Sequence, residues 1–174
     1  DTAYVLRSDG VVFEVPAYRA GPEVESETYR TDLAEADDTE GLTWHPEGYL
    51  LIAAKNVPLI QGQPEQHLRA IYRFDPQRHE LAPEPWKLIN LYDIKAWLAA
   101  TDDPELAKLA EKFDPRQTKD FMPSGLAVHP HSGHLYVISS TGKMLIVLNE
   151  AGKLVSVAYL PRKQFPQPEG ICFA

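Results

Sequence analysis

Cysteine is nearly absent from this chain, since Cys172 is the only one among its 174 residues. A single cysteine excludes a disulfide framework within the chain and any metal cluster held by several thiolates. Cys172 lies in the apolar run 171–173, so we expect a small buried hydrophobic side chain and not a nucleophile. Long apolar runs are absent from the sequence too, and no stretch has the length needed to cross a bilayer. We therefore expect no transmembrane segment in this chain.

Basic side chains are outnumbered: 17 Lys and Arg stand against 25 Asp and Glu, for a net charge of -8. Proteins that bind nucleic-acid phosphates usually carry a basic stripe, so no nucleic-acid partner is expected. The densest acidic run, residues 35–40, is typical of a solvated loop, with a contact surface for assembly as the alternative. An apolar fraction of 44% and a charged fraction of 24% fit an ordinary globular domain.

A short motif occurs three times, as Glu40-Gly41-Leu42, Ser124-Gly125-Leu126 and Glu169-Gly170-Ile171. The first two copies continue in register to His45-Pro46 and His129-Pro130, and each is followed by a turn and an apolar run typical of a strand. A fixed motif at the start of repeated hairpins indicates a repeat architecture. Four short strands in about forty residues is the size of one β-propeller blade.

These repeats predict an all-β fold, a β-propeller with about three blades in this chain and a small helical insertion. We expect one partial propeller domain over residues 1–174. Its parts are a blade segment at 1–33, a blade at 40–91 with a loop insertion at 55–69, a helical insertion at 92–121, a blade at 123–161 and the start of a next blade at 168–174. Because so few blades do not close a ring, flanking sequence or a second chain must complete it, and we favour flanking sequence.

Both insertions are expected at the end of the sheets that carries the motifs. In an antiparallel meander, the start of the first strand, the second loop and the end of the fourth strand all lie at one end. Asp103-Pro104-Glu105 predicts a helix start there, because it combines a capping acid with a proline in the first turn. Function on sheet scaffolds concentrates where loops are long, so this end is the predicted working face.

Four segments together resemble the SdiA-regulated domain family of bacterial, usually exported, β-propeller proteins. They are Tyr4–Gly10, Glu40–Trp44, Pro123–Pro130 and Phe165–Ile171. The resemblance covers nearly the whole chain apart from the insertions. It implies a periplasmic or cell-surface location, with the targeting segment outside this chain, and a likeness to lactonase-type and other six-bladed calcium propellers. It brings no defined biochemical activity.

Glu40, Ser124 and Glu169 start the three motif copies and are expected to meet at the mouth of a central tunnel. Carboxylates that converge from separate blades suit calcium, with Glu40 and Glu169 as metal ligands and Ser124 as a weaker contributor. The resemblance implies the same cofactor, because lactonase-like propellers hold calcium there. The alternative, which we favour, is that both glutamates accept hydrogen bonds from backbone N–H groups while the glycines allow close strand packing.

His67 is the histidine that we assign to the candidate ligand site, because it lies in the long loop on the predicted working face. His45 and His129 occupy equivalent positions before prolines, at the opposite end, and are expected to mark structural turns. The sequence contains no phosphate-binding loop, nucleophile elbow or metalloprotease motif, so no catalytic residue is assigned.

The sequence therefore favours a non-enzymatic binding or scaffold domain of the bacterial cell envelope. Its ligand would be a protein, a glycan or a small molecule. The alternative is a calcium-dependent hydrolase of lactonase or esterase type, in which an ion at the central tunnel polarises a carbonyl and activates a water.

Overall fold

The computed structural model describes residues 2–16 and 25–173. Residues 1, 17–24 and 174, which the predicted first and last segments include, lie outside the described residues. The described part contains three larger antiparallel sheets, one two-stranded hairpin and two α-helices. This composition confirms the predicted all-β class with a small helical insertion.

The first sheet has the order β1-β2-β3, with β1 at Thr2–Leu6, β2 at Val12–Pro16 and β3 at Glu27–Tyr29. A tight turn joins β1 to β2, in which the Gly10 N–H donates to the Arg7 carbonyl at 2.9 Å. Gly10 has a φ of 81°, a left-handed conformation that glycine adopts without steric cost. The turn between β1 and β2 therefore favours glycine at this position.

The second sheet has the order β10-β8-β5-β4. Its strands are β4 (Thr39–His45), β5 (Tyr49–Ala54), β8 (Leu68–Asp75) and β10 (Lys87–Asn90), and the short β9 (Glu80–Leu81) pairs with β8. All 6 residues of β5 are buried, which fits a strand in a sheet that is covered on both faces.

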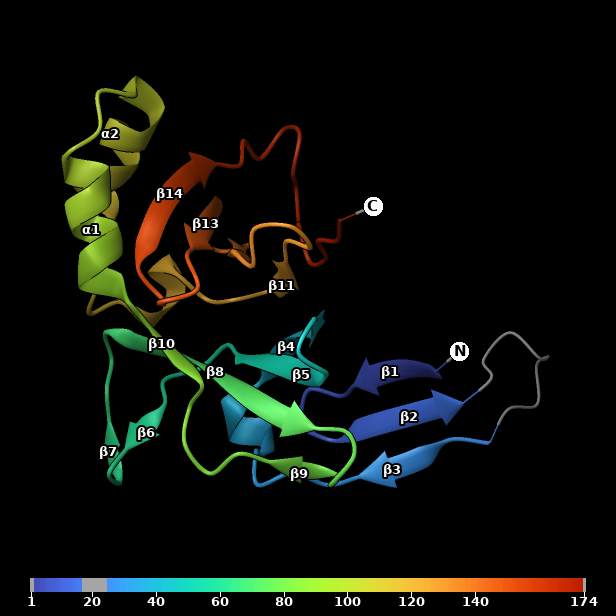
Figure 1. Cartoon of the computed structure of the whole chain (residues 1–174). Coiled ribbons are helices and arrows are strands. Elements are labelled where there is room, and N and C mark those ends of the chain that lie inside the picture. Colours follow the sequence, from blue (N-terminus) through green and yellow to red (C-terminus); the bar gives the residue numbers. More distant parts are fainter. Residues whose placement is uncertain (1, 17–24, 174) are drawn as a thin grey trace.

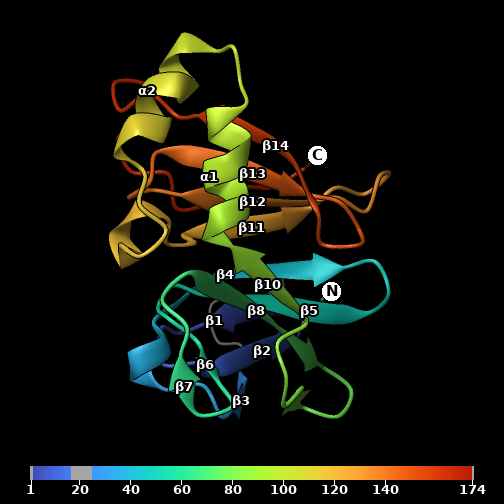
Figure 2. The ribbon, with the colours of Figure 1, turned by 90° about the vertical axis from the view of Figure 1, so that its left-hand side faces the viewer.

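Two short elements lie near the motif end of the second sheet. The hairpin of β6 (Leu59–Ile60) and β7 (Gln63–Pro64) lies within the predicted loop insertion, and the 3-10 helix η1 (Glu35–Asp37) precedes β4. Figure 2 shows β6, β7 and α2 on one side of the molecule, whereas the turn after β4 lies on the opposite side. The long and the short connections thus lie at opposite ends of the strands.

The third sheet is a plain four-stranded meander, which is the architecture of a propeller blade. Its strands are β11 (Gly125–Val128), β12 (Leu135–Ser139), β13 (Met144–Leu148) and β14 (Leu154–Tyr159). Figure 1 shows the three sheets fanned beside one another, and β4 of the second sheet contacts β11 of the third.

The helices α1 (Leu91–Ala99) and α2 (Pro104–Lys112) connect the second sheet to the third. The start of α2 is capped as its sequence predicts: the Asp103 carboxylate accepts the backbone N–H of Glu105 at 2.8 Å. In Figure 1 both helices lie at the periphery of the fan. They pack against the outer strand β14.

Hydrophobic cores cover both faces of the second sheet. Along β5, Leu51 and Ala53 belong to the core shared with the third sheet, while Leu50 and Ile52 belong to the core shared with the first. This alternation follows from the two-residue period of a strand. The core on the third-sheet side also includes five buried side chains from the helical insertion: Ile94, Leu98, Leu106, Phe113 and Phe121. The helical insertion therefore packs as part of the core between these two sheets.

A buried arginine fastens the end of the insertion to the second sheet. Arg69 is fully buried, and its guanidinium donates to the carbonyls of Phe121 at 2.8 Å and Thr118 at 2.6 Å. Thr118 opens the 3-10 helix η2 (Thr118–Asp120). Burial lowers the pKa of Arg69 to about 10. Backbone carbonyls supply the acceptors that a buried cation requires.

Two motif glycines permit the inner strands to approach one another closely. A Cβ added at Gly41 would meet the Leu126 side chain, and a Cβ at Gly125 would lie 3.1 Å from the Glu169 carbonyl oxygen. The three motif copies therefore lie in sequence order, each beside the next. This contact supports close strand packing as the role of the glycines.

Cys172 differs from its expectation. The structure places it on the surface, because the segment around Glu169–Phe173 forms no strand and has one side uncovered in the described part of the chain. An apolar run indicates burial only when both of its sides are covered, and the described residues cover only one side of this one.

Candidate functional site

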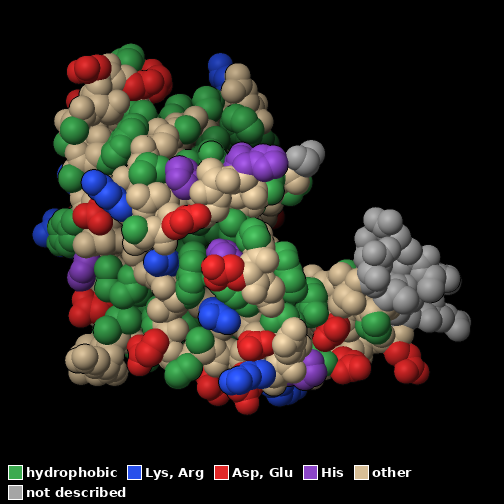
Figure 3. Space-filling model, in the orientation of Figure 1, with side chains coloured by type: hydrophobic (Ala, Val, Ile, Leu, Met, Phe, Trp, Pro, Cys, Tyr) green, Lys and Arg blue, Asp and Glu red, His purple; other side chains and the backbone are tan. Residues whose placement is uncertain are grey.

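A groove lined by polar and aromatic side chains lies between the second and third sheets, at the end with the short turns. It has a volume of about 470 Å³. One wall comes from the second sheet through His45, Tyr49 and Trp86, and the other comes from the third sheet through His131 and Glu150. Figure 3 shows acidic, basic and histidine side chains gathered across the middle of this face.

Stacked rings form the second-sheet wall of the groove. The His45 ring stacks on Tyr49 with a centroid distance of 4.3 Å, and its edge meets Trp86 at 5.7 Å. Two cations cover the cluster: the Arg73 guanidinium lies 4.2 Å from the Tyr49 ring and the Lys87 ammonium lies 5.1 Å from the Trp86 ring. Such contacts hold aromatic faces in fixed orientations, which favours stacking of a ligand on them.

Burial shifts the pKa values of two members of this cluster, Tyr49 and His45. Burial, followed by the negative charge of Glu47, raises the pKa of Tyr49 to about 12. Burial lowers the pKa of His45, an effect that the positive charge of Arg73 reinforces and the acids Glu47 and Glu150 oppose. At neutral pH both rings are therefore uncharged.

The two equivalent histidines act as turn caps. His45 Nδ1 accepts the backbone N–H of Glu47 at 3.3 Å, and His129 Nδ1 accepts the N–H of Ser132 at 3.1 Å. An imidazole nitrogen that accepts a hydrogen bond is unprotonated, so each ring carries its proton on Nε2 when neutral. The geometry is that of structural turns, as the sequence analysis expected for both residues.

Glu40 holds a lysine at the motif end of the second sheet. Its carboxylate accepts a hydrogen bond from Lys55 Nζ at 2.6 Å, and the same ammonium lies 3.3 Å from the Asp38 carboxylate. This hydrogen bond raises the pKa of Lys55 against the opposing effect of burial. Glu40 also lies where the pairing of β4 with β5 shifts by one residue, which marks a β-bulge. The ammonium occupies the position between two carboxylates where a cation would bind.

Ser124 and Glu169 lie side by side with protein partners of their own. The Ser124 hydroxyl donates to the Pro168 carbonyl at 2.9 Å and accepts the N–H of Ser140 at 3.0 Å. The Glu169 carboxylate accepts a hydrogen bond from Gln167 at 2.5 Å. Across residues 2–16 and 25–173, no three His, Cys, Asp or Glu side chains form a group able to hold a metal. The arrangement of these residues thus does not by itself fit calcium, and calcium binding stays a prediction.

His67 lies apart from the groove, at the motif end. Its Nδ1 is 3.5 Å from the Glu65 carboxylate, and its ring is 5.3 Å from Tyr92 of α1. These neighbours describe a surface histidine beside a helix. Its role in ligand binding is a prediction that nothing in the structure tests.

The groove residues Trp86, His131 and Glu150 were missed by the sequence reasoning. That reasoning favoured the end with long loops, whereas these residues lie in or beside short connections. The available signal was the pair of equivalent His-Pro turns, because neighbouring blades bring equivalent turns close together.

The fold is that of a β-propeller protein, and the groove between its second and third sheets is a candidate site. No family model and no curated protein matches the sequence, so the resemblance to the SdiA-regulated family stays a prediction. Among the described helices, none is long and apolar enough to span a membrane.

Several solved structures are similar in shape. Virginiamycin B lyase from Staphylococcus aureus matches with a TM-score of 0.44 and 10% identity, over 99% of this chain and 45% of its own. A luciferin-regenerating enzyme matches with a TM-score of 0.46 and 13% identity, over 94% and 40%. A gluconolactonase from Xanthomonas campestris matches with a TM-score of 0.40 and 17% identity, over 91% and 46%. This chain spans less than half the length of each of these proteins. The propeller fold is therefore assigned from the arrangement of the sheets in this chain.

Proposed function

We propose that this chain is a non-enzymatic binding domain that holds a small polar ligand with an apolar ring face, such as a sugar, in the groove between its second and third sheets. The observation that carries the proposal is the oriented ring cluster of His45, Tyr49 and Trp86, with the Glu150 carboxylate in the facing wall. Ligand sites combine apolar walls with a few placed polar groups. The proposed bacterial cell-envelope location is supported by the family resemblance alone.

The polar groups of the groove support binding rather than catalysis. His45 Nδ1 accepts a backbone N–H and the ring is stacked on Tyr49, so the imidazole is held as part of the turn. Lys87 lies over the Trp86 ring. Groups held in this way orient a ligand but are poorly placed to transfer a proton to it.

The test is a screen of mono- and oligosaccharides by tryptophan fluorescence and isothermal titration. Trp86→Ala should weaken the binding of a hit by at least about tenfold, because one stacking contact is worth about 1.4 kcal/mol. Tyr92→Ala is the matched control, since Tyr92 is a half-exposed aromatic residue on α1, outside the groove. A screen without hits, or equal affinity of the two variants, would contradict the proposal.

The alternative function is a calcium-dependent lactonase or esterase-like hydrolase, with Glu40 and Glu169 as the metal ligands. It predicts that calcium raises the melting temperature and that Glu40→Gln or Glu169→Gln removes the increase. An unchanged melting temperature in calcium and in chelator would leave the binding domain as the better description.

A further inference from the structure

A small pocket lies at the motif end of the third sheet, between α2 and the turn that joins β12 to β13. It has a volume of about 210 Å³. One wall includes Leu109 and Lys112 of α2, and the other includes Thr141 and Lys143 of the turn and Tyr159 at the end of β14. We call it the α2 pocket. It lies at the opposite end of the strands from the groove between the second and third sheets, so it is a separate site.

The two walls of the α2 pocket are fixed to one another. A Cβ added at Gly142 of the turn would collide with the backbone carbonyl of Asp120, at the end of the helical insertion. Beside this contact, the backbone N–H of Met122 donates to Ser139 Oγ at 3.0 Å. The turn and the insertion therefore form a pocket that exists before any ligand binds, as most small-molecule sites do.

The floor of the α2 pocket is apolar and continuous with the hydrophobic core. Phe113 is only 2% exposed and belongs to the core between the second and third sheets. Leu109 and Tyr159 are partly buried and pack against the same core. Such a surface suits the apolar body of a small ligand.

A lysine with no acidic partner stands on the helix side of the α2 pocket. Lys112 is exposed in the last turn of α2. One turn earlier, Lys108 pairs with the Glu105 carboxylate at 2.7 Å, whereas no salt bridge within the described part of the chain engages Lys112. Its ammonium is therefore available to an anion from solution.

The lysine on the turn side is held in an uncommon backbone conformation. Lys143 has a φ of 53°, in the left-handed region that favours glycine, and such strain is frequent at ligand sites. Its Nζ donates to the Pro166 carbonyl at 2.9 Å, which leaves two of the three N–H donors of the ammonium for a ligand. Asp120 is the acid of the lining, and its carboxylate accepts the Asp114 N–H at 2.7 Å. The lining thus has more positive than negative side chains, although the whole chain has a net charge of -8.

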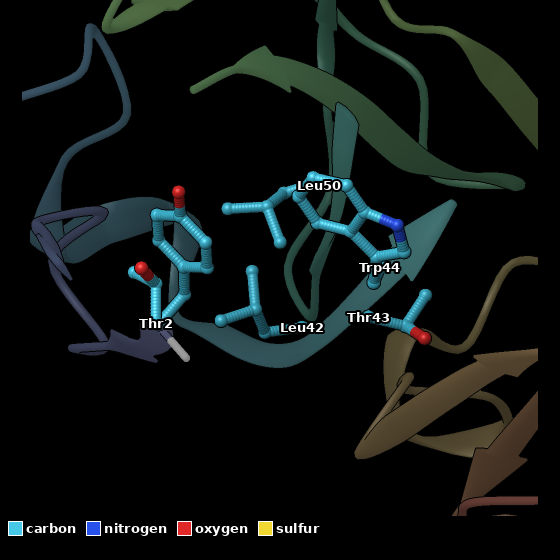
Figure 4. A pocket seen from close by; sticks show the side chains of 6 residues that line it. Thr2, Leu42, Thr43, Trp44 and Leu50 are labelled. Carbon is cyan, nitrogen blue, oxygen red and sulfur yellow. The ribbon is translucent and has the colours of Figure 1, made fainter. Parts of the chain in front are cut away.

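The hollow between the first and second sheets has a different chemistry. It has a volume of about 520 Å³, and Figure 4 shows Leu42, Leu50 and Trp44 turned toward the space beside Thr2. None of the described residues that line it is Asp, Glu, Lys or Arg. A small anion would therefore select the α2 pocket over this larger hollow.

We propose that the α2 pocket binds a small monocarboxylate with an apolar body, such as an aryl acid or a short-chain acyl acid. The carboxylate pairs with Lys112 and Lys143, whose long side chains can turn toward it. The apolar body lies on Leu109, Phe113 and Tyr159. A pocket of about 210 Å³ is smaller than the sites of about 300–1,000 Å³ that hold drug-sized ligands, which limits the ligand to a small acid. Binding here does not depend on a ligand in the groove between the second and third sheets.

Isothermal titration with matched acids and amides tests the charge requirement of the α2 pocket. Benzoate and hexanoate are the probes, and benzamide and hexanamide are their neutral counterparts. We expect saturable binding of at least one acid and at least about tenfold weaker binding of its amide, because the amide lacks the charge that meets the two lysines. Absence of saturable binding by both acids, or equal affinity for an acid and its amide, would overturn the proposal.

A pair of lysine variants places the binding in the α2 pocket. Lys112→Met keeps an apolar stem and should weaken acid binding at least about fivefold, because it removes one charged partner of the carboxylate. Lys153→Met is the matched control, since Lys153 is exposed just before β14, at the opposite end of that strand from Tyr159. Equal affinities of the two variants for the acid would overturn the assignment to this pocket.

Discussion

The two interfaces of the second sheet differ in how completely they are closed. Towards the third sheet, the inner strand β11 lies against β4, and α1 and α2 pack into the core that the two sheets share. Towards the first sheet, the core is a small cluster around Val12, Ile52 and Phe74, and Trp44 remains half exposed. Among the described residues, the interface with the first sheet has no inner strand beside β4 and no helix packed between the two sheets. We call the interface with the third sheet the closed interface.

This difference has a physical origin in blade geometry. Sheets fanned about a centre diverge towards the periphery, so their outer strands leave a widening gap. At the closed interface the helical insertion provides apolar side chains for that gap, including Leu98 and Phe113. At the interface with the first sheet, the described residues leave Trp44 half exposed.

Removal of the buried arginine is the strongest way to break the closed interface. Arg69→Met keeps the volume but leaves the carbonyls of Phe121 and Thr118 without their donors. We expect the free energy of unfolding, measured by urea titration, to fall by about 3 kcal/mol.

The matched control is Arg73→Met, because Arg73 is exposed and lies over the Tyr49 ring. Its loss should cost at most about 1 kcal/mol. Equal effects of the two substitutions would show that the insertion is not fastened through Arg69.

Sequence patterns predicted the individual strands and helices better than the way these elements pack against one another. The meander of β11 to β14 and the Asp103 cap of α2 are local features, and turn residues and capping acids reveal them. The role of α1 in the core depends on which sheet face it meets, and no local pattern specifies that. The division into blades and the blade number stay predictions.

The candidate site was harder to predict for the same reason. Trp86 and Glu150 come from different sheets, so their proximity is visible only after the sheets are packed. Lys55 pairs with Glu40 across two strands. Nothing about the position of Lys55 in the sequence indicated that its ammonium would occupy the metal position predicted beside Glu40. Cys172 looked buried because its run is apolar, although the described residues cover only one side of it.

A second prediction compares two glycines of the same motif. Gly41 lies in the closed interface, where an added methyl would meet the Leu126 side chain and lie 3.1 Å from Ala53. Gly41→Ala should lower the free energy of unfolding by about 2 kcal/mol, because overpacking forces neighbours to move. Gly170→Ala is the control and should change the free energy of unfolding by less than about 0.5 kcal/mol, because a Cβ added at Gly170 would meet nothing within 4 Å. Similar losses at both positions would contradict the difference in packing.

The smallest expected effect is a change in how stability depends on pH, caused by His45 at the short-turn end of the closed interface. Burial lowers the pKa of His45 in the folded chain below its ordinary value of 6.5. A histidine with a lowered folded pKa stabilises the fold fully above its unfolded pKa, and this contribution is lost as the pH falls through 6.5 towards the folded pKa. Protonation of Nδ1 would also remove the acceptor for the Glu47 N–H.

We therefore expect His45→Gln to reduce the loss of melting temperature between about pH 8 and pH 5, measured by calorimetry, relative to the unmodified chain. His131→Gln is the matched control, because His131 is exposed in the facing turn and should leave the pH profile unchanged. If both variants lose as much melting temperature between pH 8 and pH 5 as the unmodified chain does, the burial of His45 does not contribute to the pH dependence of stability.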